Sequence, residues 1–155
     1  MLEVKKIRKL SEFKDNSLLI VDDDNPFRER LSRSMEKKGF KVSQAEGVKK
    51  GIEAVKIEKP AFAVVDLRLN DGNGLEVVKE IQNSNSNSRI VMLTGYGNIP
   101  TAVAAIKEGA IDYLSKPADA DDVEKALLAG PNKQAEPPEN PMSADRVKWE
   151  HIHRV

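Results

Sequence analysis

The most regular feature of the sequence is an alternation of short apolar runs with segments whose apolar residues recur every three or four positions. Three of the runs are apolar at every position, which is typical of strands that a sheet buries on both faces. Two more mixed runs predict further strands. The five predicted strands span residues 18–21, 40–45, 62–65, 90–93 and 111–114.

A segment of helical spacing follows each predicted strand. In the first, Phe27, Leu31 and Met35 are four residues apart, and Asn25 and Pro26 before them predict an N-cap and a first helical residue. The other four helices are marked by Val48, Ile52 and Val55; by Leu75, Val78 and Ile81; by Val103 and Ile106; and by Val123, Leu127 and Leu128. This alternation predicts an α/β fold, a parallel sheet with helices on both faces.

The character of the chain changes at both ends of this pattern. Residues 1–16 carry a basic cluster, which we interpret as a solvated arm, and residues 17–129 form the predicted domain. Residues 130–142 are rich in proline and predict an extended linker. Residues 143–155 have an amphipathic pattern, and we interpret them as the start of a second domain.

Composition removes several classes of function. Lys+Arg and Asp+Glu number 25 each, so no net charge attracts the chain to nucleic acid or to an anionic membrane. No apolar run approaches the ~20 residues of a membrane span. With 0 cysteines, disulfides and thiol-based metal sites are excluded. We expect a cytoplasmic protein.

Polar side chains follow four of the predicted strands. Asp22 and Asp23 follow the first, Asp66 ends the third, Thr94 ends the fourth and Lys116 follows the fifth. The carboxyl ends of parallel strands meet at one edge of a sheet, where functional groups gather. Converging carboxylates need a cation at neutral pH, and oxygen ligands favour Mg²⁺. A carboxylate nucleophile, a metal, an ammonium and a hydroxyl are the parts that phosphoryl transfer requires.

Each of these residues is unremarkable alone. An aspartate after a strand is usually a helix cap or turn residue, and Asp24 fits that simpler interpretation. Their combination, at successive strand ends in this order, is what favours a phosphoryl-transfer site.

The same segments resemble the receiver domains of two-component response regulators. The resemblance covers roughly residues 17–128, and it implies a flavodoxin-like doubly wound sheet of five strands in the order 2-1-3-4-5, with five helices. The segments that carry it are Ile20-Val21-Asp22-Asp23-Asp24, Val65-Asp66-Leu67, Met92-Leu93-Thr94-Gly95 and Tyr113-Leu114-Ser115-Lys116-Pro117.

The resemblance assigns roles to the acidic residues. It implies that Asp66 is the phosphoacceptor and that Asp22 and Asp23 form an acid pair. Mg²⁺ would be held by these aspartates and by the main-chain carbonyl of Arg68. Such a domain is a switch, limited to self-phosphorylation and slow autodephosphorylation, rather than a turnover enzyme.

The resemblance also implies a signalling route. Lys116 would contact the phosphoryl oxygens. The peptide bond between Lys116 and Pro117 would be cis. Thr94 and Tyr113 would form the switch, and Arg68 with Tyr96 would tune the phosphoryl lifetime. The partner would be a sensor histidine kinase, with homodimer formation on phosphorylation as a further expectation.

Further residues resemble one subgroup of response regulators. Many receiver domains have an aromatic residue after Lys-Pro, whereas Ala118 and Asp119 follow here. With the Pro-rich linker and residues 142–155, this pattern is similar to the RegA/PrrA/ActR group of redox-responsive transcriptional regulators. In that group a Fis-type helix-turn-helix domain follows, and most of it is missing from this sequence. DNA binding would require that missing domain.

Three alternatives share parts of this pattern. A haloacid-dehalogenase-type phosphatase needs an acid two residues after the nucleophile, where Arg68 stands. A flavodoxin-like cofactor binder needs a Ser/Thr/Gly-rich phosphate loop after the first strand, where three aspartates stand. A docking module without phosphoryl chemistry would lack one or more of the key residues, and all of them are present.

Overall fold

The protein has the alternating architecture that the sequence predicts. Its structure, a computed structural model, describes residues 9–95 and 99–129. A parallel sheet has the order β2-β1-β3-β6-β7, made of β1 (Ser17–Val21), β2 (Lys41–Ala45), β3 (Phe62–Asp66), β6 (Arg89–Thr94) and β7 (Asp112–Ser115). The helices are α1 (Asn25–Lys37), α2 (Val48–Glu58), α3 (Leu75–Ser84), α4 (Ile99–Lys107) and α5 (Ala120–Leu128). β6 and β7 are the fourth and fifth strands of this sheet in chain order, because β4 and β5 lie outside it. The predicted flavodoxin-like fold with strand order 2-1-3-4-5 is therefore confirmed.

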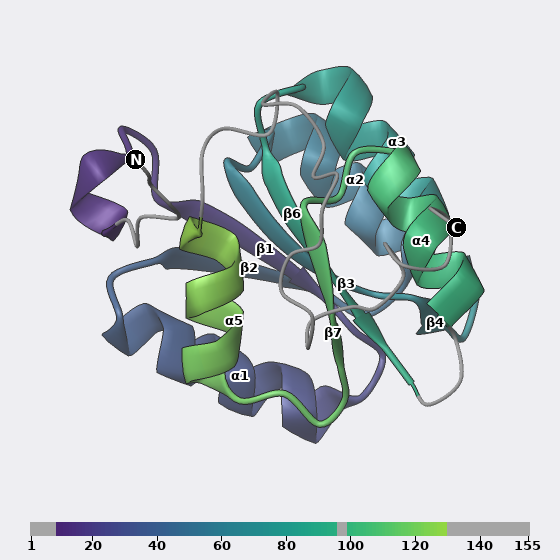
Figure 1. The fold of residues 1–155 in the computed structure, drawn as a ribbon, viewed down its shortest axis with the longest axis horizontal. Coiled ribbons are helices and arrows are strands. Elements are labelled where there is room, and N and C mark those ends of the chain that lie inside the picture. Colours follow the sequence, from purple (N-terminus) through teal and green to yellow (C-terminus); the bar gives the residue numbers. More distant parts are fainter. Residues whose placement is uncertain (1–8, 96–98, 130–155) are drawn as a thin grey trace, which may run out of the picture.

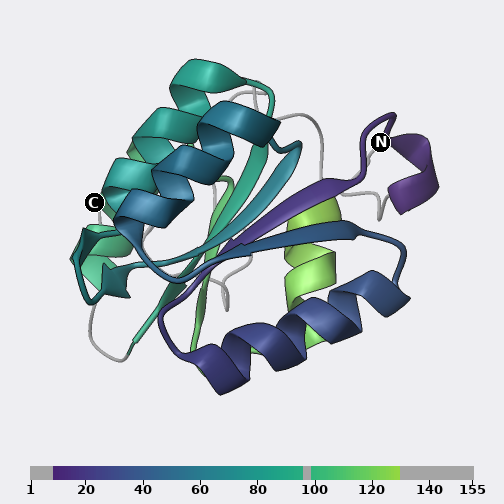
Figure 2. The same cartoon turned by 180° about the vertical axis from the view of Figure 1, so that it is seen from behind.

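The sheet is covered on both faces. Helices α1 and α5 pack on one face, and α2, α3 and α4 pack on the other (Figures 1 and 2). Each face has its own apolar core, and every residue of β3 and β6 is buried because these strands lie between neighbours and between helices. The edge strands β2 and β7 are more exposed, which explains their more mixed sequences.

Helix α1 begins one residue earlier than the sequence suggested. Asp24 is the N-cap, and its carboxylate accepts a hydrogen bond from the Phe27 amide at 3.1 Å. The prediction of Asn25 as N-cap is therefore wrong, whereas the interpretation of Asp24 as a cap is confirmed. Pro26 still lies in the first turn, where its missing N–H has no helical partner to lose.

The segment between β3 and α3 contains a small antiparallel hairpin, β4 (Arg68–Leu69) and β5 (Gly72–Asn73). Between its strands, the Asp71 carboxylate accepts hydrogen bonds from the amides of Val48 and Lys49, at 2.8 and 3.1 Å. These bonds cap α2 and hold the pKa of Asp71 below its usual value. They tie the loop that follows Asp66 to the neighbouring helix.

The predicted arm is not wholly solvated. A 3-10 turn, Leu10–Glu12, leads to Phe13, whose ring centroid lies 5.2 Å from that of Phe62 in an edge-on arrangement. Leu10 and Phe13 pack against the core beneath α1 and α5.

Several predictions fall outside the described residues. They concern most of the basic cluster (Lys5, Lys6 and Arg8), Tyr96, the linker over residues 130–142 and the amphipathic start of a second domain over residues 143–155. Among the helices that the structure does describe, none has the length and apolar character to cross a membrane.

Candidate functional site

Three carboxylates meet at the carboxyl edge of the sheet. β1 and β3 are neighbours in register, with Val21 opposite Val65, so the next residues, Asp22 and Asp66, emerge side by side. One carboxylate oxygen from each of Asp22, Asp23 and Asp66 lies within 4.8 Å of the others. Asp22 and Asp66 are buried and Asp23 is half-buried. The predicted convergence of these side chains is confirmed.

A single ammonium group lies between two of these acids. The Nζ atom of Lys116, in the loop after β7, is 3.0 Å from Oδ2 of Asp22 and 3.2 Å from Oδ2 of Asp66. It also lies 5.0 Å from the centroid of the Phe27 ring. Burial acts to lower the pKa of Lys116, but the hydrogen bonds and charges of the two aspartates outweigh it and raise that pKa. The peptide bond to Pro117 is cis, as expected.

One lysine does not compensate the acidic cluster. Burial, followed by the negative charge of Asp22, raises the pKa of Asp66 to about 6, although Lys116 and a hydrogen bond from the Arg68 amide act in the opposite direction. A carboxylate in this state gains from a second cation nearby. Three clustered oxygen donors, without cysteine or histidine, match the ligand preference of Mg²⁺. The residues present therefore fit this metal.

The raised pKa of Asp66 makes metal-free stability depend on pH. Because the folded chain holds this proton more tightly than the unfolded chain, the contribution of Asp66 to the free energy of unfolding should fall as pH rises from about 4 to about 6. Asp66→Asn removes the titration, so in EDTA the variant should gain stability over the wild type across that window. Urea unfolding of both proteins at each pH measures this difference, in which titrating groups that do not interact with Asp66 cancel. A difference that does not change with pH would contradict it. Added Mg²⁺ should stabilise the wild type, because a ligand that binds only the folded state of a chain raises its free energy of unfolding.

Thr94 lies next to this cluster along the sheet edge. It ends β6 with 1% of its surface exposed, and its carbonyl oxygen accepts a hydrogen bond from the Lys116 amide at 2.9 Å. Tyr113 on β7 is half-buried and packs against the core beneath α2, α3 and α4. The structure thus brings Thr94 to the site and leaves Tyr113 one strand away, in register with Met92.

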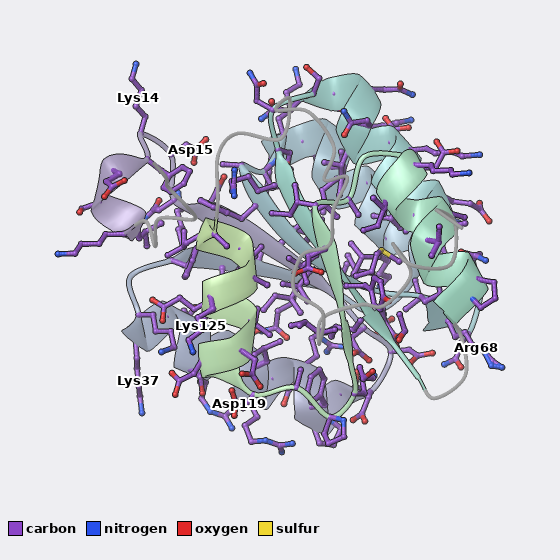
Figure 3. All side chains as sticks on the ribbon, viewed as in Figure 1. Lys14, Asp15, Lys37, Arg68, Asp119 and Lys125 are labelled. Carbon is purple, nitrogen blue, oxygen red and sulfur yellow. The ribbon has the colours of Figure 1, made fainter. Side chains whose placement is uncertain are left out.

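Arg68 reaches the site through its main chain only. Its amide contributes the hydrogen bond to Asp66, while its side chain is exposed and points outward beside β4 (Figure 3). No acid or base is therefore supplied from the position that a haloacid-dehalogenase-type phosphatase would use. The assignment of its carbonyl as a metal ligand stays a prediction.

The backbone of Gly74 packs closely against the backbone of Asp66. Gly74, at the start of α3, packs so tightly that an added Cβ would lie 2.2 Å from the Asp66 carbonyl oxygen and 3.0 Å from Val65 Cγ1. The amide of Gly74 donates to the Leu67 carbonyl at 2.8 Å. In the sequence, Gly74 lies in a run of turn-forming residues, which gives no sign of this contact.

Two open grooves lie on the surface near the carboxyl edge of the sheet. One, of about 450 Å³, lies between α1 and the loop after β7, and its lining includes Phe27, Leu31, Pro117 and Ala118. The other, of about 410 Å³, includes Asp23 together with residues of the β4–β5 hairpin and the start of α2. The second groove therefore gives direct access to Asp23, whereas the first is lined by none of the three acids or Lys116.

The residues after Lys-Pro, where the sequence departs from many receiver domains, have structural roles. Ala118 is buried in the core beneath α1 and α5. Asp119 is the N-cap of α5, and its carboxylate accepts from the Asp122 amide at 2.9 Å (Figure 3). The departure leaves the acidic cluster and Lys116 intact.

A doubly wound sheet with this set of strand-end residues defines a receiver domain. The chain belongs to the family described as response regulator receiver domain, which matches residues 18–128.

Two similar regulators indicate the subgroup of response regulators that this chain resembles. The chain is 62% identical to the photosynthetic apparatus regulatory protein RegA of Rhodobacter capsulatus, over 91% of this chain and 77% of RegA. It is 59% identical to the acid tolerance regulatory protein ActR of Rhizobium meliloti (strain 1021), over 91% of this chain and 73% of ActR. The predicted similarity to the RegA and ActR regulators is confirmed, and both relatives extend beyond the matched part.

A solved structure supports the same class. A response regulator protein from Burkholderia pseudomallei, crystallised with a phosphorylated aspartic acid, a calcium ion and citrate, is 37% identical. It superposes with a TM-score of 0.71, covering 90% of this chain and 83% of that one.

Proposed function

We propose that this receiver domain accepts a phosphoryl group on Asp66 from a partner histidine kinase, in a reaction that needs Mg²⁺, and that the phosphorylated form switches a transcriptional output. The observation that carries the proposal is the cluster of Asp22, Asp23 and Asp66 around the ammonium of Lys116. The domain acts as a switch in the cytoplasm rather than as a turnover enzyme.

The chemistry follows from the positions of these groups. With a pKa of about 6, Asp66 is largely ionised at neutral pH, and a carboxylate oxygen attacks the phosphorus of phosphohistidine. An oxygen–phosphorus bond forms as the phosphorus–nitrogen bond breaks, and the histidine imidazole leaves and takes up a proton. Asp22, Asp23, Asp66 and the Arg68 carbonyl would hold Mg²⁺, which supplies positive charge beside the transferred group. Lys116 lies close enough to turn its ammonium from Asp66 Oδ2 to the phosphoryl oxygens.

Access and relatives support this assignment. The groove that includes Asp23 gives a phosphohistidine-bearing partner a route to the acidic cluster. The Burkholderia relative carries a phosphorylated aspartic acid together with a divalent, oxygen-preferring ion. In the longer regulators, the signal would pass through the linker to a helix-turn-helix domain, and phosphorylation would favour a homodimer. The proposal includes the division of the chain into an N-terminal arm, a receiver domain (17–129), a linker and the start of a second domain.

Thr94→Ala should separate signalling from acceptance. We propose that the Thr94 hydroxyl turns toward the phosphoryl group and that Tyr113 moves inward with it, biasing a two-state equilibrium. The variant should accept the phosphoryl group at a rate within about 10-fold of the wild-type rate. A group that is essential for proton transfer contributes about 100-fold or more, and we do not expect that role for Thr94. Phosphorylation should no longer change hydrogen exchange in α4, β7 and α5.

The control is Ser115→Ala. Ser115 is exposed on β7 and is the register partner of Thr94 on β6, so this variant removes a hydroxyl from the neighbouring strand. It should keep both the rate and the exchange response. An unchanged exchange response in Thr94→Ala would show that this hydroxyl does not transmit the switch.

Incubation of the full chain with acetyl phosphate tests the proposed function. Phosphate-affinity electrophoresis should resolve a retarded band in Mg²⁺ and none in EDTA. The absence of a retarded band under both conditions, from a chain that unfolds cooperatively, would argue for a docking module without phosphoryl chemistry.

A further inference from the structure

We propose that Arg28 is a positioning residue that fixes the Asp22–Asp23 turn in the geometry that binds Mg²⁺. The inference rests on the proposed function, because it concerns the same metal site. Arg28 is neither a metal ligand nor in contact with the transferred group, and it acts through the main chain of the acid pair.

The guanidinium of Arg28 joins three elements at the edge of the sheet. Its Nη1 donates to the main-chain carbonyl of Asp22 at 2.9 Å and to Oδ1 of Asn25 at 2.7 Å. Its Nε donates to Oε1 of Gln44 at 2.8 Å. These bonds connect the end of β1, the start of α1 and strand β2.

The bond to Asp22 completes the restraint of that residue. The Asp22 amide donates to the Ala45 carbonyl at 3.1 Å, and its Oδ1 accepts from the Asp24 amide at 2.9 Å. The carbonyl that Arg28 holds belongs to the peptide bond between Asp22 and Asp23. Its orientation sets the direction in which Asp23, the more exposed of the three clustered acids, leaves the strand.

The residue type supports a positioning role. Only 8% of the surface of Arg28 is exposed, and a buried guanidinium is costly unless its donors are used. Its three close hydrogen bonds go to neutral oxygens, while the exposed carboxylate of Glu29 is 3.9 Å away. Arginine presents five donors in a rigid planar fork, which suits the simultaneous restraint of several acceptors. An arginine kept for surface charge would not be buried in this way.

Mg²⁺ titration of the full chain by calorimetry tests the proposal without any phosphoryl donor. Arg28→Met keeps an unbranched apolar stem in place of the arginine stem and removes all three bonds. The Kd for Mg²⁺ should rise at least about 10-fold, as is typical when a partner of a metal ligand is lost. Urea unfolding establishes that the variant is folded at the titration temperature.

The chain contains a matched control. Arg89 is also buried, with 3% of its surface exposed, and its guanidinium also holds main-chain carbonyls, those of Leu127, at 2.6 Å, and Ala129. It begins β6, so it lies at the amino edge of the sheet, opposite the acidic cluster. Arg89→Met should lose stability and bind Mg²⁺ with the wild-type Kd.

A second variant separates charge from geometry and covers a failure of Arg28→Met to fold. Arg28→Lys keeps the positive charge and loses the fork, so its Kd should still rise severalfold. A wild-type Kd in a folded Arg28→Met or Arg28→Lys chain would overturn the proposal, as would an equal loss of affinity in Arg89→Met. A wild-type chain that binds Mg²⁺ but is not phosphorylated by acetyl phosphate would refute the proposed function alone. A wild-type chain that binds no Mg²⁺ would overturn both.

Discussion

Asp66→Asn should reduce phosphorylation by acetyl phosphate to background while leaving the fold intact. The amide is a poor nucleophile, and it removes the negative charge of one of the three clustered carboxylates. Since Asp66 is buried beside Asp22, the amide also relieves repulsion between neighbouring acids, so the variant should remain folded. Phosphate-affinity electrophoresis after equal incubation times measures the loss.

Asp24→Asn is the matched control for this substitution. It makes the same chemical change in a carboxylate that caps α1, and asparagine caps helices as well as aspartate does. Its phosphorylation should equal that of the wild type. Stable phosphorylation of Asp66→Asn would place the acceptor elsewhere.

Gly74→Ala should lower the free energy of unfolding by about 3 kcal/mol, at the upper end of the usual cost of overpacking. The new methyl group would lie 2.2 Å from the Asp66 carbonyl oxygen, so either α3 or the end of β3 must move. This contact and the one with Val65 Cγ1 both involve the buried strand that carries Asp66, the proposed phosphoacceptor. Phosphorylation should therefore slow in whatever fraction remains folded.

Gly95→Ala provides the comparison. It adds the same methyl group at the edge of the site, where an added Cβ meets no atom within 4 Å among the described residues. Its unfolding free energy should stay within about 0.5 kcal/mol of the wild type. Urea unfolding of the two variants decides the matter, and equal losses would show that the contact with Asp66 is not the cause.

Long-range order in this fold was predictable because it follows from local patterns. The unbroken apolar runs of β1, β3 and β6 indicated burial on both faces, and alternation with helices dictated a parallel sheet. Asp22, Asp66 and Lys116 are far apart in sequence, but each stands at the end of a strand. The topology alone brings such positions together.

The features that were not predictable depend on contacts that leave no pattern in the sequence. Arg28 lies between apolar residues of α1 and resembles any surface residue of an amphipathic helix. Gly74 and Asp71 lie in a segment dense in turn-forming residues, which does not reveal that one packs on Asp66 and the other caps α2. Phe13 lies in a mostly polar arm, and only the packed structure brings its ring to Phe62.

The central claim is that Asp66 itself carries the phosphoryl group. An acyl phosphate on aspartate is reduced by borohydride to homoserine, which marks the residue permanently. After incubation with acetyl phosphate and Mg²⁺, reduction and peptide mass spectrometry should find homoserine at position 66, and EDTA should abolish it. Homoserine at another aspartate, or none in a chain that has gained a phosphoryl group, would contradict the account.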